Sequence, residues 1–166
     1  MATSPVVPTA AVRAATDADV GSIIAMADAA ANTLRGQRGA DVMLAREAPV
    51  PTASTLADWI ARSDATVLLG LLDDQPVGVA SASVEVLVGG ERLAVIPMLW
   101  VEEEARSVSV GEALLNALVD WARAQGCASI DAYALPGERV TKNFFEAAGF
   151  KARLLTVHHR LDAEPS

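Results

Sequence analysis

The stretch that decides the fold is Leu-Trp-Val-Glu-Glu-Glu-Ala-Arg-Ser-Val-Ser-Val-Gly-Glu-Ala, residues 99–113 of the 166-residue chain. An apolar run ends in three carboxylates, and an arginine, small residues and a glycine precede an amphipathic pattern. This order predicts a strand, a tight loop and the N-terminus of a helix. Backbone N–H groups at a helix start lack partners within the helix, and the helix dipole adds positive partial charge there. The stretch therefore predicts an anion site suited to a pyrophosphate.

Strand and helix patterns surround this stretch on both sides. They predict strands at 11–14, 67–72, 77–88, 91–101, 129–134 and 153–161, and helices at 17–31, around Leu56 and Trp59, at 111–125 and at 139–148. The three strands before the stretch follow one another through short turns, which predicts an antiparallel meander. The helix at 111–125 predicts a parallel, right-handed crossover. Residues 32–53 show no period, which indicates a long irregular segment of functional or mobile character.

Pro97 lies inside the predicted strand 91–101 and cannot donate a hydrogen bond to a neighbouring strand. A two-residue turn at Gly89-Gly90 would place Pro97 opposite Ala82 as a hydrogen-bonded pair. We therefore predict a bulge or a longer loop that shifts this register.

Length and composition indicate one globular domain at 11–162 between tails at 1–10 and 163–166. No apolar run approaches the roughly 20 residues of a membrane span. The N-terminus lacks the features of a signal peptide, and the single Cys127 suits a reducing cytoplasm. A net charge of −8 argues against a nucleic-acid partner and favours a cationic or amine substrate, although acidic surfaces also serve solubility alone.

Three separated motifs occur in the order of one protein family. Arg106-Ser-Val-Ser-Val-Gly111 is similar to R/Q-x-x-G-x-G/A, and Asn143–Phe150 is similar to aromatic-Glu-x-x-Gly-Phe. The opening Val12–Asp19 is close to the same family's first strand and helix. Together they resemble the GNAT superfamily of acyl-CoA N-acyltransferases. The resemblance implies an α/β fold with a mixed, mostly antiparallel sheet of about six or seven strands, splayed between the fourth and fifth and flanked by about four helices.

The resemblance also implies acetyl-CoA as co-substrate, held between the splayed strands without a metal. A bulge after Val101 would open these strands, and an amide near Val101 would polarise the thioester carbonyl. The residues that the resemblance assigns to the cofactor are Leu99, Trp100, Val101, Arg106, Ser107, Val108, Ser109, Val110, Gly111, Glu112, Ala113, Lys142, Asn143 and Phe145.

Two positions depart from the family pattern. Ser109 replaces the first glycine of the loop motif, and Phe145 replaces a tyrosine that often protonates the departing thiolate. Tyr133, the only tyrosine, is the nearest substitute donor, and Glu103 and Glu85 are candidate bases. Each has an alternative role: Tyr133 as a packed side chain, and either glutamate as a solvated surface charge.

These features predict a cytoplasmic N-acetyltransferase, monomeric or homodimeric, that transfers the acetyl group of acetyl-CoA to a primary amine. The amine of an unidentified small molecule or protein would attack directly in a ternary complex. The alternative is a catalytically degenerate module of the same fold that binds acyl-CoA or a protein partner in a regulatory role. His158 and His159, adjacent on a predicted strand and without a cysteine or carboxylate pattern, do not indicate a metal site.

Overall fold

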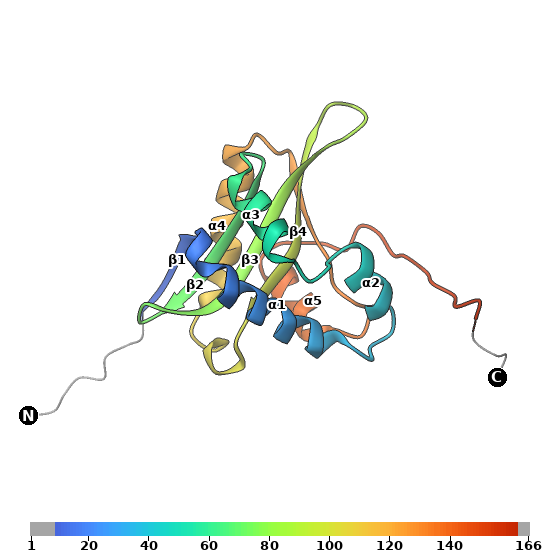
Figure 1. Ribbon diagram of the computed structural model, residues 1–166. Helices are drawn as coiled ribbons and strands as arrows, with labels where there is room; N and C mark the ends of the chain where they lie inside the picture. The colour runs from blue at the N-terminus through green and yellow to red at the C-terminus, as the bar shows by residue number, and fades with distance from the viewer. Residues whose placement is uncertain (1–8, 163–166) are drawn as a thin grey trace, which may run out of the picture.

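A five-stranded sheet organises the computed structural model, which describes residues 9–162 (Figure 1). The strands are β1 (Ala10–Ala14), β2 (Ala65–Leu72), β3 (Gln75–Val86), β4 (Arg92–Val101) and β5 (Ser129–Ala132). The helices are α1 (Val20–Leu34), α2 (Ala40–Arg46), α3 (Ala53–Ala61), α4 (Val110–Ala124) and α5 (Arg139–Ala147), with 3-10 turns η1 (Asp17–Asp19) and η2 (Glu103–Ala105). Within the described range, no helix combines the length and apolarity that a membrane crossing requires.

The strands lie in the sheet in the order of the sequence. The first four are antiparallel, and β5 runs parallel to β4 after the crossover through α4, so the predicted meander and crossover are confirmed. Asp73 (φ 47°) and Asp74 (φ 65°) form the left-handed turn between β2 and β3. The β3–β4 hairpin has a loop longer than two residues, because the Leu87 amide donates to the Glu91 carbonyl at 2.8 Å.

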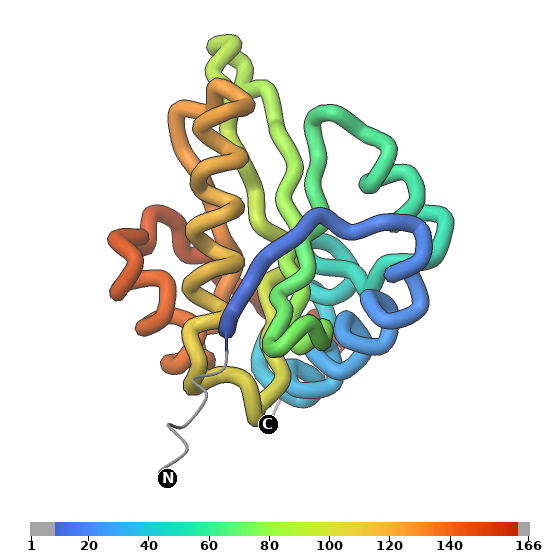
Figure 2. The backbone as a smooth tube through the Cα atoms, turned by 90° about the vertical axis from the view of Figure 1, so that its left-hand side faces the viewer, coloured from blue at the N-terminus to red at the C-terminus, as the bar shows by residue number. Residues whose placement is uncertain are grey.

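Helices cover both faces of the sheet (Figure 2). On one face, Ile23 of α1 and Leu56 of α3 pack on β2 and β3. On the other face, α4 lies so close to the sheet that a β-carbon at Gly70 would be 2.5 Å from Val110 Cγ1. A β-carbon at Gly78 would be 3.1 Å from Leu114 Cδ1. These two glycines therefore let α4 approach the strands directly.

The prediction that residues 32–53 are irregular throughout is wrong, because this segment contains α2. The helix has seven residues, too few to show a clear hydrophobic period. A helix this short is unstable alone and depends on tertiary packing. Ala40, which is fully buried, provides that packing at its first position.

The predicted strand at 153–161 is also wrong. These residues form no helix or strand, pair with no described strand, and are exposed throughout. Thus the sheet has five strands rather than six or seven, and His158 and His159 lie on no strand. Of the predicted tails, residues 1–8 and 163–166 lie outside the described residues, and Ala10 belongs to β1. Strand propensity was present at the C-terminus, but a strand also needs a partner.

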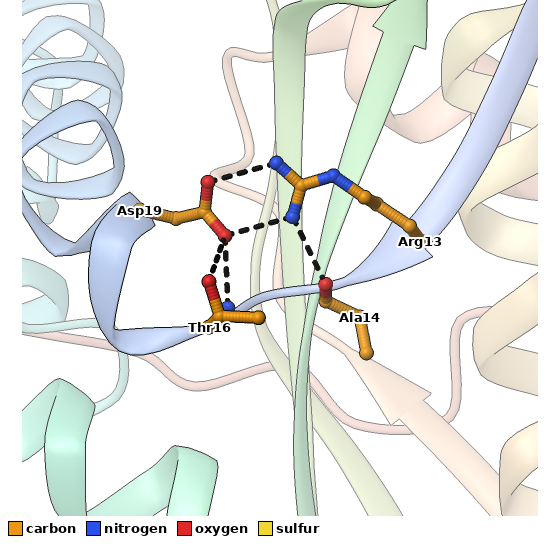
Figure 3. Close-up of polar contacts among 4 residues, drawn as sticks. All are labelled: Arg13, Ala14, Thr16 and Asp19. Atoms are coloured by element: carbon orange, nitrogen blue, oxygen red, sulfur yellow. Dashed lines mark hydrogen bonds and ion pairs between the residues drawn. The ribbon is translucent and has the colours of Figure 1, made fainter.

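The start of α1 is fixed by a buried carboxylate (Figure 3). Asp19 accepts hydrogen bonds from Arg13 Nη1 at 2.7 Å and Nη2 at 2.8 Å. It also accepts from the Thr16 amide at 2.8 Å and from the Thr16 hydroxyl at 3.0 Å. The guanidinium of Arg13 is the largest cause that holds the pKa of Asp19 well below its usual range, followed by the Thr16 amide. The carboxylate thereby links the end of β1 to the first helical turn.

We expect Asp19→Asn to lower the free energy of unfolding by about 2 kcal/mol at pH 7, because two charged hydrogen bonds are lost. The carboxylate is ionised in the folded state well below its unfolded pKa of about 3.9, so its stabilisation is present above that pH and fades as the pH falls further. Urea unfolding at pH 7, 5 and 3 should therefore show the difference between wild type and variant shrinking toward pH 3.

The matched control is Asp17→Asn, which removes an exposed carboxylate from the same 3-10 turn. It should change the unfolding free energy by less than about 0.5 kcal/mol. A constant difference between wild type and Asp19→Asn across this pH range would contradict the role assigned to the ionised carboxylate.

Candidate active site

The parallel strands β4 and β5 separate at Pro97. Their pairing ends at Ile96 with Ala132, whereas β3 remains paired with β4 as far as Val101. Within the described residues, positions 97–101 of β4 thus have no strand partner on the β5 side. The predicted splay is confirmed, but it does not begin after Val101 as we expected.

A bulge in β4 lies at the same position. The β3–β4 register shifts between Ser81 and Ser83, so that Ile96 and Pro97 together lie opposite Ala82. A bulge bends its strand and increases the local twist. Pro97 also has no N–H to continue a ladder. The expected bulge is therefore confirmed, in the middle of β4, where both effects turn the strand away from β5.

The free part of β4 leads directly into a tight loop. The Glu102 amide donates to the Val77 carbonyl at 2.8 Å, which ties the end of β4 to β3. The Arg106 side chain donates through Nε to the Val101 carbonyl at 3.0 Å and closes the loop over the buried Ala105. Arg106 is thus a structural support of the loop, and the residue as a whole is exposed.

Several amides of this loop and of the first turn of α4 have no hydrogen-bond acceptor in the described part of the chain. They belong to Ser107, Ser109, Val110, Gly111 and Glu112, and the first intrahelical bond follows from Ala113 to Ser109. The positive end of the α4 dipole lies at the same place. Unpaired amides at a helix N-terminus are the arrangement by which many proteins bind anions.

Ser109 has φ 61° and ψ 11°, in the left-handed region, and its side chain makes no capping hydrogen bond. Serine is therefore strained where the family motif has glycine. Gly111 needs no such conformation, and a β-carbon there would lie 3.5 Å from Phe144 and 3.6 Å from Val101. Gly111 thus lies between the end of β4 and α5.

Tyr133 is the candidate acid nearest to the point of separation, one residue beyond the last β4–β5 pair. Partial burial is the largest cause that raises the pKa of its hydroxyl, and the negative charges of Glu85, Glu47 and Asp131 raise it further. The hydroxyl therefore keeps its proton at neutral pH, as a general acid must. The negative charge of Glu85, another predicted catalytic residue, thus reaches Tyr133, although the two side chains form no hydrogen bond.

The other predicted residues lie farther along the loop and α5. Glu103 is exposed in η2, beyond the far end of β4. Lys142 forms an exposed ion pair with Glu146 at 3.3 Å, and Asn143 is exposed. Phe145 is buried, with its ring centroid 5.4 Å from that of Phe144 in an edge-on arrangement. Among residues 9–162, no cluster of three or more histidine, cysteine or acidic side chains is suited to a metal.

A comparison with protein-family models identifies the family of the chain. The model of the acetyltransferase (GNAT) family matches residues 29–150, which is more than half of the chain. The chain belongs to the GNAT acetyltransferase family. The match includes β4, the loop between β4 and α4, α4 itself, and the candidate bases Glu85 and Glu103. No curated protein matches the chain significantly.

Solved structures share the fold of this GNAT domain. A tetramutant of the BH1408 protein from Bacillus halodurans is 18% identical, with a TM-score of 0.77 over 91% of this chain and 99% of that one. An aminoglycoside acetyltransferase from an uncultured soil metagenomic sample, in complex with sisomicin, is 15% identical, with a TM-score of 0.69 over 93% and 97%. The acetyltransferase AAC(6')-Iy, in complex with the bisubstrate analogue CoA-S-monomethyl-acetylneamine, is 15% identical, with a TM-score of 0.67 over 93% and 99%.

Sequence reasoning missed two features of the GNAT domain. The indole Nε1 of Trp100 is buried and has no hydrogen-bond partner among residues 9–162, beside a hollow of about 300 Å³ between α1 and the ends of β3 and β4. Glu47 follows α2 and contributes to the charge around Tyr133, yet its segment showed no pattern. A larger hollow of about 500 Å³ is lined by α3 and Arg62 alone and lies away from the separated strands.

We expect Ser109→Gly to raise the free energy of unfolding by up to about 1 kcal/mol. Relief of the left-handed strain gains about 1–2 kcal/mol, and the greater freedom of glycine in the unfolded chain offsets part of it. Ser107→Gly is the matched control, because Ser107 in the same loop does not have a positive φ. The control should lower stability in thermal unfolding, and a lower stability of Ser109→Gly would show that serine is not strained there.

Proposed function

We propose that this protein is an acetyl-CoA-dependent N-acetyltransferase that acetylates a primary amine by direct attack in a ternary complex. One observation carries the proposal: the unpaired part of β4, residues 97–101, runs straight into the unpaired amides at the start of α4. A ligand with a peptide-like arm and a pyrophosphate would satisfy both sets of groups. Acetyl-CoA has both parts, and when bound it supplies a thioester as the acetyl donor.

The residues present fit such a ligand. Backbone groups of Pro97–Val101 are free to pair with the amides of a pantetheine arm, as an added strand would. The unpaired amides of Ser107 and of Ser109 to Glu112 would hold the pyrophosphate, with the exposed residue Arg106 beside them. A backbone amide near Val101 would stabilise the developing negative charge on the thioester oxygen. Binding would thereby orient the acetyl group along β4.

The acceptor amine would lie on the Tyr133 side of the separated strands. Carboxylates of Glu47, Glu85 and Asp131 contribute negative potential there and favour a cationic amine. Glu85 would accept a proton from the amine, directly or through water, and Tyr133 would give a proton to the departing thiolate. The amine class is supported by relatives of the same fold that are aminoglycoside acetyltransferases.

The second candidate function is a GNAT-fold module that binds acyl-CoA or a protein partner without turnover. Phe145 favours this second function. Its side chain is buried in the core and has no proton to give, whereas many relatives have tyrosine at this position. In either function the chain would work in the cytoplasm, without nucleic acid or membrane, since its single cysteine and net charge of −8 suit that setting.

We expect acetyl-CoA and CoA to stabilise the protein in a thermal-shift assay, and ATP to have little effect. A ligand at 100 times its Kd adds about 2.7 kcal/mol to the free energy of unfolding.

Glu112→Pro should weaken acetyl-CoA binding about tenfold, because it removes an unpaired amide where a helix tolerates proline. Glu112→Ala, which keeps the amide, is the matched control. No stabilisation by acetyl-CoA would overturn the proposal, and equal affinities of the two variants would contradict the pyrophosphate placement.

We expect Tyr133→Phe to lower kcat about 100-fold in an assay for free thiol across a panel of amines, with little change in KM for acetyl-CoA. The wild-type kcat should not fall through loss of the proton donor as the pH rises to 9. The reason is that the pKa of Tyr133 is raised above its ordinary value of about 10, so its hydroxyl stays protonated. An unchanged kcat would assign protonation of the thiolate to water. Binding of acetyl-CoA without turnover of any amine would favour the second function.

A further inference from the structure

Arg153 holds the carboxylate of Asp131 in a fork at the end of β5. Its Nε donates to Oδ1 at 2.8 Å and to Oδ2 at 3.1 Å, and its Nη2 also donates to Oδ2. The arginine comes from the exposed chain after α5, 22 residues farther along the sequence. The contact therefore brings a positive charge to β5 from a segment that forms no strand beside it.

The fork lies close to the candidate acid. Tyr133 follows Asp131 by two residues, so their α-carbons are at most about 7 Å apart. Ala132, which lies between them, packs against the core beneath α4, so the alternation of the strand turns Asp131 to the opposite side. Tyr133 comes next in this alternation and is 36% exposed. Through Asp131, Arg153 is thus anchored beside Tyr133.

The other charges around Tyr133 are negative. After partial burial, which is the largest cause, the carboxylates of Glu85 in β3, Glu47 after α2 and Asp131 in β5 raise the pKa of its hydroxyl. Arg153 lowers this pKa, and among the charges of the described residues that act on it, Arg153 carries the only positive one. A phenolate at this position therefore has one cation to oppose the surrounding carboxylates.

Stability gives little reason for this ion pair. The Arg153 side chain is 63% exposed, and an exposed pair contributes only about 0–1 kcal/mol. Substitution of Arg153 should therefore leave the fold intact, and its effect on Tyr133 can be measured in the folded protein.

We propose that Arg153 is a positioning residue of the acetyl transfer, which stabilises the phenolate left when Tyr133 gives its proton to the departing thiolate. The inference rests on the proposed function, in which Tyr133 is the acid. In that step the amine nitrogen bonds to the acetyl carbon, the carbon–sulfur bond breaks, and the Tyr133 proton moves to the sulfur. Glu85 takes the amine proton, and the phenolate regains a proton from water. The guanidinium offsets the charge of Asp131 while the phenolate exists.

A titration of the single tyrosine in the chain tests this role directly. Fluorotyrosine incorporated during expression labels position 133 alone, and its more acidic phenol titrates while circular dichroism still shows a folded protein. We expect Arg153→Gln to move the midpoint of the fluorine NMR titration to higher pH, because it removes the positive charge. Asp131→Asn should move the midpoint to lower pH, because it removes a negative one.

Arg160→Gln is the matched control, since it removes another exposed guanidinium of the same segment, one that pairs with Asp162. It should leave the midpoint unchanged. In the thiol assay, Arg153→Gln should lower kcat several-fold without changing the KM for acetyl-CoA, and Arg153→Lys should restore most of the loss. In a Tyr133→Phe background, Arg153→Gln should lower kcat no further.

An unchanged midpoint in Arg153→Gln would overturn the proposal, as would an equal shift in Arg160→Gln. A loss of kcat through Arg153→Gln that persists in the Tyr133→Phe background would also overturn it, because the arginine would then act without the phenol. Each of these results leaves the proposed acetyl transfer standing. A wild-type kcat in Tyr133→Phe would instead remove the acid role of Tyr133, and the role of Arg153 with it.

Discussion

The interruption of β4 at Ile96 and Pro97 is the constraint on which the rest of the structure depends. Before it, β4 is a central strand with a neighbour on each side, and after it β4 pairs with β3 alone. The proline lacks a donor and the bulge turns the strand, so the sheet opens without losing its antiparallel half. An opening made in this way exposes backbone groups of a strand that remains rigidly held on its other side.

The loop and helix that follow place unpaired amides directly after this opening. The close packing of α4 on Gly70 and Gly78 fixes the helix against the sheet, so its N-terminus lies beside the end of β4. Arg106 holds the loop by its bond to Val101 rather than acting only as a free charge. Strain at Ser109 is confined to the residue before the first turn, where the amides must turn outward.

The two ends of the described chain are stabilised very differently. At the N-terminal end, Asp19 is buried in a network with Arg13 and Thr16 that joins β1 to α1. At the C-terminal end, the segment after α5 is exposed and has no strand partner among the described residues. The contrast shows that the sheet is anchored firmly at its N-terminal end, whereas the chain after α5 is held only by exposed ion pairs.

The sequence by itself determined the meander, the crossover through α4, the turns at glycine and the shift of the β3–β4 register at Pro97, because these depend on local period and backbone chemistry. It also indicated the anion loop, since a strand, a run of small residues and an amphipathic helix in this order are typical of a tight loop that leads into a helix N-terminus. Only the tertiary structure decided that the charges of Glu47 and Glu85 act on Tyr133, that Phe145 is buried, and that segment 153–161 pairs with no described strand. These facts depend on which surfaces meet across long separations in the chain, and local pattern carries no information about that.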